Sequence, residues 1–242
     1  MFNKMLNKIL LTSLVTALGL GSAPKLEAQT YHDSDLAQQL QEIQFVPPQG
    51  GEEPETRGAG TRNPLSSSCT ADEPAMQLIM PDGNYGLTTQ ARPAILLYLP
   101  QTTATKVVLS FRSEDREEPE VAFLAIDSEQ AINSFALPLD KPELEIGKTY
   151  QWQLSVVCGD LPHVNDPLFT GWVTRTPLDL ALGRDLENNP QKMSQQPPLE
   201  QARWFAANGY WYDLIQQIEI VARTTPTGKI DPTLWLQLVD RF

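Results

Sequence analysis

The 242-residue sequence has few of the residues that carry most enzyme chemistry. It contains only two histidines, His32 and His163, and two cysteines. A zinc site needs three or four converging ligands, and a Ser–His–acid triad needs an oriented histidine beside an exposed serine. We find neither pattern and no G-x-S-x-G elbow. The sequence therefore predicts no metal site, no cofactor and no familiar catalytic residue, and His163 fits a solvated loop.

No apolar run is long enough to span a bilayer, which takes about 20 residues. The longest, Ile9 to Leu20, follows the basic residues Lys4 and Lys8 and precedes small residues. This order predicts a signal peptide over residues 1–28, with cleavage after Ala28 favoured over cleavage after Ala23. The alternative is a retained amphipathic anchor. We therefore expect an exported protein, periplasmic or extracellular, with no stable membrane span after cleavage.

Positive charge is also scarce, with 18 Lys and Arg against 30 Asp and Glu. Removing residues 1–28 takes away three Lys and one Glu, which leaves a net charge of −14. Such a surface repels phosphate backbones and anionic lipids. This excludes nucleic acid as a partner and favours an envelope or extracellular protein, or a glycan.

The two cysteines, Cys69 and Cys158, both lie in the mature chain. In an oxidising compartment an even count predicts one disulfide, and a loop this long would gain about 4 kcal/mol from it. Two buried free thiols are the alternative. Asp160, Asn165 and Asp166 supply oxygens of the kind that calcium prefers, but they do not follow the known calcium-loop spacing.

Composition divides the mature chain into four parts. Residues 29–74 have few apolar positions and are expected to be a mostly disordered N-terminal segment and linker. Residues 75–176 hold short apolar or alternating runs separated by turn signals, which predict an immunoglobulin/fibronectin-like antiparallel β-sandwich. The seven runs are Met76–Met80, Ala94–Leu99, Lys106–Arg112, Val121–Ile126, Ile132–Leu137, Tyr150–Cys158 and Phe169–Thr174. A second linker spans 177–198, and residues 199–242 show helical spacing.

One local pattern sharpens the sandwich prediction. Leu144 and Gly147 precede Tyr150 in the manner of a tyrosine corner, in which the hydroxyl binds backbone a few residues upstream. The alternation through Tyr150 and Trp152 points both rings at the core.

The helical tail is rich in aromatic residues. Its spacing resembles a single tetratricopeptide-like unit, which cannot bury its own apolar face and must pack on the sandwich or on a partner. We consider five rings as candidate partner-binding anchors, because a short tail has little core to offer them: Trp204, Tyr210, Trp211, Tyr212 and Trp235. Core packing within the chain is the alternative.

Several segments in order resemble a secreted cyanobacterial family catalogued as domain of unknown function 928. They are Arg57–Arg62, Gly86–Thr88, Arg92–Pro100, Leu144–Trp152 running to Cys158, Gly171–Val173 and Ala206–Asp213. The resemblance implies export and β structure and assigns no activity.

Three functions remain open from the sequence. The first is a non-catalytic interaction or structural module of the cell envelope that docks through its helical tail. The second is a carbohydrate-binding module that uses rings on the sandwich such as Trp172 or Tyr98. The third is an enzyme with an unfamiliar carboxylate site, which needs a carboxyl in an apolar pocket.

Overall fold

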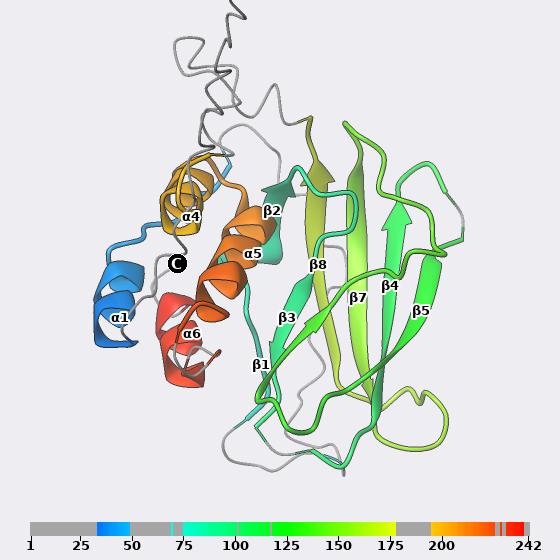
Figure 1. Ribbon diagram of the computed structural model, residues 1–242. Coiled ribbons are helices and arrows are strands. Elements are labelled where there is room, and N and C mark those ends of the chain that lie inside the picture. The colour runs from blue at the N-terminus through cyan, green and yellow to red at the C-terminus, as the bar shows by residue number, and fades with distance from the viewer. Residues whose placement is uncertain are drawn as a thin grey trace, which may run out of the picture.

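The computed structural model describes residues 33–48, 69, 75–100, 102–116, 118–177, 195–225, 228 and 231–239. Within them, eight strands form two sheets, and the helices gather at one side of these sheets (Figure 1). The predicted signal peptide lies outside the described residues, as do His32, residues 49–68 and residues 178–194. The fold class is therefore the predicted one, a β-sandwich followed by short C-terminal helices.

The smaller sheet has the order β1-β3-β6 and the larger sheet has the order β2-β8-β7-β4-β5. The strands of the smaller sheet are β1 (Gln77–Leu78), β3 (Ile95–Tyr98) and β6 (Ile132–Phe135). The strands of the larger sheet are β2 (Tyr85–Thr88), β4 (Lys106–Ser113), β5 (Glu120–Ala125), β7 (Thr149–Val157) and β8 (Leu168–Arg175). Each of the seven runs named from the sequence overlaps one of these strands.

Strand β2 was not predicted, and it changes the character of the larger sheet. It follows a single 3-10 turn, η2 (Asp82–Asn84), and pairs in parallel with β8, so that Tyr85 stands opposite Trp172. The other pairings are antiparallel. The predicted antiparallel sandwich therefore includes one parallel pair, because β2 lies beside β8 at the edge of the larger sheet.

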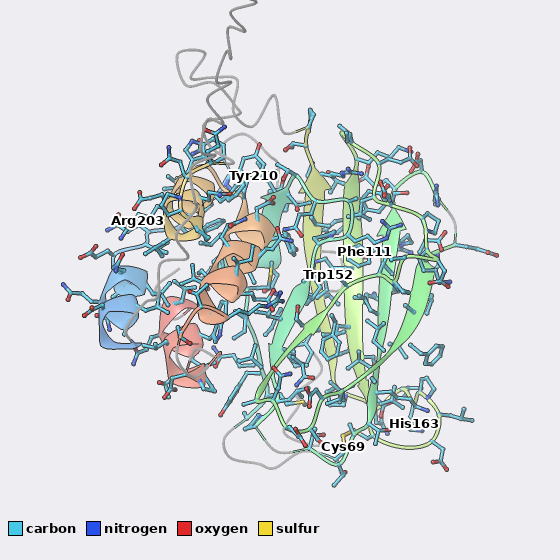
Figure 2. All side chains as sticks on the ribbon, in the orientation of Figure 1. Cys69, Phe111, Trp152, His163, Arg203 and Tyr210 are labelled. Carbon is cyan, nitrogen blue, oxygen red and sulfur yellow. A yellow bond between two sulfur atoms is a disulfide. The ribbon has the colours of Figure 1, made fainter. Side chains whose placement is uncertain are left out.

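The sandwich core follows from alternation along the central strand β7. Its inward side chains Tyr150, Trp152, Leu154 and Val156 are buried, and the residues between them are more exposed. Trp152 stands opposite Phe111 of β4, and both rings lie among the strands (Figure 2). Side chains that alternate in this way bury one face of the sheet and leave the other open.

Three C-terminal helices match the three apolar faces expected from the sequence. They are α4 (Pro198–Ala207), α5 (Trp211–Ala222) and α6 (Pro232–Val239). Helix α5 packs against α4 and against strand β2, so the helical tail is joined to the edge of the larger sheet (Figure 1).

Part of the segment expected to be mostly disordered is folded. Helix α1 (Asp33–Gln41) packs against α6, and its side chains Leu36 and Leu40 are buried. The chain that follows crosses the helices, where the Phe45 ring meets the Trp211 ring edge-on at 5.1 Å between centroids. The expectation of disorder does not hold for residues 33–48, because the apolar side chains that this Gln-rich stretch carries at helical spacing pack against other helices.

Among the described residues, none of the helices combines the length and the apolar character that crossing a membrane requires.

Candidate functional site

Four of the five candidate anchor rings are buried. Tyr210, Trp211, Tyr212 and Trp235 keep between 1% and 6% of their surface exposed, and only Trp204 is half-buried. The prediction of an exposed aromatic patch is wrong for these four rings. The sandwich edge and the N-terminal segment supply the packing surface that the short tail lacks.

A chain of hydrogen bonds ties helix α5 to the sandwich. The Trp152 indole N–H donates to the Tyr212 hydroxyl at 2.7 Å, and that hydroxyl donates to the carbonyl of Trp172 at 2.8 Å. The Trp211 indole N–H donates to the carbonyl of Ile79 at 3.2 Å. Burial raises the pKa of Tyr212, so its hydroxyl stays protonated and able to donate.

Glycines make room for these close contacts. A Cβ at Gly86 of β2 would stand 2.7 Å from the Cβ of Trp211, and one at Gly171 of β8 would stand 2.3 Å from the Trp152 ring. Gly209, between α4 and α5, has a φ of +80° and lies against Pro48. We call the contact of Gly86, Trp152, Gly171, Trp211 and Tyr212 the junction.

Asp213, in the first turn of α5, stabilises the junction through hydrogen bonds to Thr89. It is buried, and its carboxylate accepts hydrogen bonds from the Thr89 backbone N–H at 3.0 Å and from the Thr89 hydroxyl. Burial raises the pKa of this carboxyl, and the Thr89 hydrogen bonds act in the opposite direction. An acid in the first turn also complements the helix dipole. These bonds give Asp213 a structural role.

The tyrosine corner is present. The Tyr150 hydroxyl accepts a hydrogen bond from the backbone N–H of Glu145 at 2.9 Å. Leu144 is buried beneath it, and Gly147 takes a φ of +82° at the turn into β7. Tyr150, Leu144 and Gly147 thus lie at or next to the turn into β7, and Trp152 is fully buried in the core.

Cys69 and Cys158 form a disulfide, with 5.1 Å between their Cα atoms, so the alternative of two free thiols is wrong. The carbonyl of Cys69 also accepts hydrogen bonds from the Thr102 hydroxyl at 2.8 Å and the Thr103 N–H at 3.0 Å. These bonds hold residue 69 beside the start of β4, at the end of the sandwich that also carries the His163 loop (Figure 2).

The loop between β7 and β8 is organised by Asp166. Its buried carboxylate accepts from the N–H groups of Cys158, at 3.3 Å, and His163, at 2.8 Å. His163 is exposed, as a solvated loop residue would be. Across the described part of the chain, no three His, Cys, Asp or Glu side chains converge as a metal site would require.

The outer face of the larger sheet carries a row of four side chains on adjacent strands: Tyr85, Trp172, Gln151 and Arg112. We call it the Trp172 row. Tyr85, Trp172 and Gln151 are half-buried and Arg112 is exposed. Since neighbouring strands lie about 4.8 Å apart, the row extends over roughly 14 Å.

A hollow of about 360 Å³ opens at one end of the row. Trp172, Gln151 and Arg112 line it with residues of the β4–β5 turn, including Asp115. Arg112 donates to the side-chain oxygen of Gln151 at 3.0 Å, which fixes both groups. The hydrogen bond from Lys148 lowers the pKa of Asp115 to about 2, so the hollow keeps an ionised carboxylate at neutral pH.

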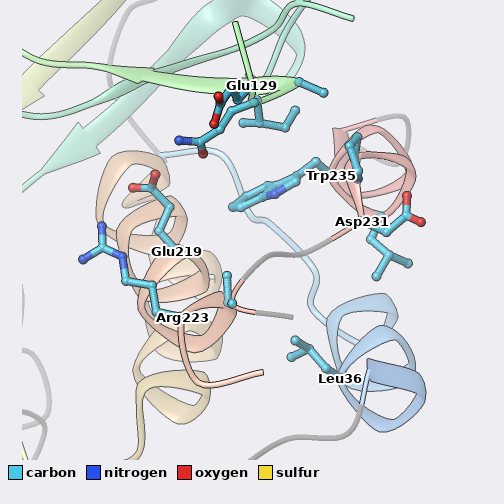
Figure 3. A pocket seen from close by; sticks show the side chains of 13 residues that line it. Leu36, Glu129, Glu219, Arg223, Asp231 and Trp235 are labelled. Carbon is cyan, nitrogen blue, oxygen red and sulfur yellow. The ribbon is translucent and has the colours of Figure 1, made fainter. Parts of the chain in front are cut away.

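A larger cavity of about 720 Å³ lies between the β5–β6 turn and the helices. Leu36 of α1, Glu129 of the turn, Glu219 of α5 and Trp235 of α6 face it from four directions (Figure 3). We call it the Trp235 cavity. Burial raises the pKa of Glu219, while a hydrogen bond from Ser134 and the charge of Arg223 oppose that change.

The family described as Domain of Unknown Function (DUF928) matches residues 57–242, more than half of the chain. The chain belongs to this family. A search of curated proteins found no match. Among solved structures, the fn3 domain of human collagen alpha-1(XX) chain is similar at 12% identity and a TM-score of 0.25, with 46% of this chain and 86% of that chain covered.

The segments that carry the resemblance to the DUF928 family meet in two places. Gly86–Thr88, Gly171–Val173 and Ala206–Asp213 build the junction. Arg92 hydrogen-bonds Glu143 at 2.9 Å, which ties the Arg92–Pro100 segment to the tyrosine corner. Their roles here are in packing. Arg57–Arg62 lies outside the described residues.

Sequence reasoning missed the Trp235 cavity and most of the Trp172 row. The cavity draws on α1, the β5–β6 turn, α5 and α6, which no local motif connects. The row depends on the pairing of β2 with β8. The only available signal was Trp172, an aromatic residue on the polar side of a predicted strand.

Proposed function

We propose that this protein is an exported, non-catalytic binding module of the cell envelope, and that the Trp172 row binds a glycan. The observation that carries this proposal is the alignment of two aromatic rings and two planar polar side chains across one open sheet face. Binding sites typically combine an aromatic surface with a few fixed polar groups.

The chemistry of the row suits a sugar chain. Tyrosine and tryptophan offer an apolar ring face together with a polar edge, which matches the C–H faces and hydroxyl groups of a sugar ring. Gln151, Arg112 and Asp115 add donors and acceptors beside Trp172. A row across several strands offers contacts to more than one sugar unit.

Two features support export. The basic and apolar N-terminal stretch has the order of a signal peptide, and the Cys69–Cys158 disulfide is of a kind that persists in oxidising compartments. The buried rings Tyr210, Trp211 and Tyr212 make hydrogen bonds within the chain, so the proposal assigns them no partner.

A glycan array probed with the mature protein would identify the ligand, and titration of the best glycan would give its affinity. Trp172→Ala is expected to weaken binding at least tenfold, which corresponds to about 1.4 kcal/mol. The backbone carbonyl that receives the Tyr212 hydroxyl is retained in this variant.

Phe123→Ala is the matched control. Phe123 lies on the same outer face, on β5, and is 63% exposed. The proposal requires that its removal leaves binding unchanged. Equal losses in the two variants, or no binding on the array by a folded protein, would count against the Trp172 row.

A further inference from the structure

The Trp235 cavity is lined by more acidic than basic side chains. Glu129, Glu219 and Asp231 line it together with a single guanidinium, that of Arg223. In the part of the chain that the structure describes, none of the three carboxylates has an ion pair within 4.0 Å. Asp231 is occupied at the start of α6, where it accepts from the Thr233 N–H and hydroxyl. Glu219 receives a hydrogen bond from Ser134 and lies near the charge of Arg223, and the Glu129 carboxylate has no hydrogen bond among the described residues.

Trp235 provides a second, independent observation. Its side chain extends from α6 into the cavity, with Glu129 above the ring and Glu219 across from it (Figure 3). The residue is 4% exposed, and its indole N–H has no hydrogen-bond partner among the described residues. This nitrogen is not among the fully buried unpaired side-chain atoms of the described residues, so it is accessible, and an accessible unpaired donor can bind a ligand that carries an acceptor.

The remaining walls are apolar. Leu36, Ile132 and Leu234 line the cavity beside the Trp235 ring. Such walls suit an alkyl body, and a ring face attracts a cation placed over it. A hard metal ion instead needs six or more oxygen ligands, and the described residues contain no cluster of that type.

From this geometry we propose that the Trp235 cavity binds an aliphatic ammonium ion that also carries a hydroxyl or carbonyl oxygen. The ammonium group lies between Glu129 and Glu219 over the Trp235 ring, the oxygen accepts from the indole N–H, and the alkyl stem contacts the apolar wall. This site is separate from the Trp172 row and does not depend on glycan binding. The same chemistry is offered by a free amino alcohol and by a lysine side chain with its backbone carbonyl.

The test uses the mature protein labelled with ¹⁵N, in which the Trp235→Phe variant identifies the indole resonance of Trp235. Addition of 5-aminopentan-1-ol is expected to shift this resonance saturably. Two probes of similar size separate the contribution of the oxygen acceptor from that of the positive charge. Pentylamine lacks the acceptor and is expected to bind more weakly, and 1,5-pentanediol lacks the charge and is expected not to bind.

Variants then test the carboxylates. Glu129→Gln and Glu219→Gln are each expected to weaken binding of 5-aminopentan-1-ol by about tenfold, because each removes one charge beside the ammonium group. Glu118→Gln is the matched control, since Glu118 is exposed in the β4–β5 loop. Glu129 is also exposed, so its substitution leaves the fold intact even where that of Glu219 does not.

A comparison of two ligands distinguishes the possible sources, a partner protein or a free amine, and tighter binding of either ligand supports the site. Tighter binding of Nα-acetyl-lysine-N-methylamide than of 5-aminopentan-1-ol indicates a lysine of a partner protein, and the reverse indicates a free amine. The proposal is overturned if the Trp235 resonance does not move or if 1,5-pentanediol binds equally well. An equal loss in Glu118→Gln would also overturn it, because binding would then reflect the general negative charge of the surface.

Discussion

The Trp152 indole N–H donates to the hydroxyl of Tyr212 at 2.7 Å, so the centre of the sandwich core is bonded directly to the first turn of helix α5. Both side chains are buried, with exposed fractions of 0% and 1%. A polar contact this deep is strong and leaves little room for alternative packing. The helical tail is therefore a built-in part of the sandwich, which explains why its rings are unavailable as exposed anchors.

Gly86→Ala is expected to destabilise the protein by about 1–3 kcal/mol, the usual cost of overpacking a core. The new methyl would stand 2.7 Å from the Cβ of Trp211, and neither atom can rotate away, because both are attached directly to the backbone. Urea unfolding followed by circular dichroism measures the change.

Gly159→Ala is the control for this prediction. Its Cβ would meet only the carbonyl of Leu161, at 4.0 Å, and the residue lies in the exposed β7–β8 loop. We expect an effect within about 0.5 kcal/mol, as for an ordinary surface substitution. Similar midpoints for the two variants would contradict the tight approach of α5 to β2.

Asp213→Asn tests the buried carboxylate through the pH dependence of stability. Burial raises the pKa of Asp213 in the folded protein above 3.8, so the folded state holds its proton more tightly than the unfolded state does. The contribution of this group to stability is therefore greatest below pH 3.8 and is lost as the pH rises through the raised pKa.

The asparagine variant lacks this titration. The stability advantage of the wild type over Asp213→Asn is consequently expected to shrink as the pH is raised from 3.8 towards neutrality. Paired urea unfolding curves over this range measure it. A difference that stays constant or grows with pH would show that the Thr89 hydrogen bonds outweigh burial.

The strands were largely predictable because alternation is a local property. In the Tyr150–Cys158 run, the alternation of apolar and polar residues indicates which face of the strand is buried. The tyrosine corner before it is also a local motif. Strand β2 was not predictable in this way. Gly86 interrupts its pattern, and its partner β8 lies more than eighty residues further along the chain. A parallel pairing of that span depends on the assembled fold.

The candidate site was likewise predictable only where it depends on local sequence. The sequence reveals how many rings the tail contains, but it does not reveal which surface covers them. Trp211 meets Phe45 from a Gln-rich stretch and approaches Gly86 of β2, both distant in sequence. The packing that buries these rings comes from non-local contacts, and so does the Trp235 cavity.

Reduction of the Cys69–Cys158 disulfide is expected to destabilise the mature protein by about 4 kcal/mol, because the bond closes a loop with a sequence separation of 89 residues. Thermal unfolding with and without a reductant measures the change, and Cys69→Ser/Cys158→Ser should lie close to the reduced protein. A reductant that lowers the melting temperature of the double variant as well would indicate an effect unrelated to this bond.

Tyr150→Phe is expected to cost about 1–3 kcal/mol, since it leaves the backbone N–H of Glu145 without its acceptor in a partly buried position. Chemical unfolding measures the loss. Tyr98→Phe serves as the control, because the hydroxyl of Tyr98 has no hydrogen bond among the described residues. Equal stability of Tyr150→Phe and the wild type would remove the tyrosine corner as a stabilising element.

The lowered pKa of Asp115, which lies beside the Trp172 row, can be measured directly. The hydrogen bond from Lys148 is the main cause that lowers the pKa of Asp115 from 3.8 to about 2, and it raises the pKa of Lys148. A lowered carboxyl pKa stabilises the fold above pH 3.8, and this contribution is lost as the pH falls through about 2.

Carboxyl NMR titration of the wild type should find the low midpoint of Asp115. Lys148→Gln should return it towards 3.8, while Lys141→Gln, in the same connection between β6 and β7, should leave it low. Added salt should move the wild-type midpoint in the same upward direction, because both side chains reach solvent and their attraction is screened. A midpoint that Lys148→Gln does not change would show that Lys148 does not hold this carboxylate in its ionised form.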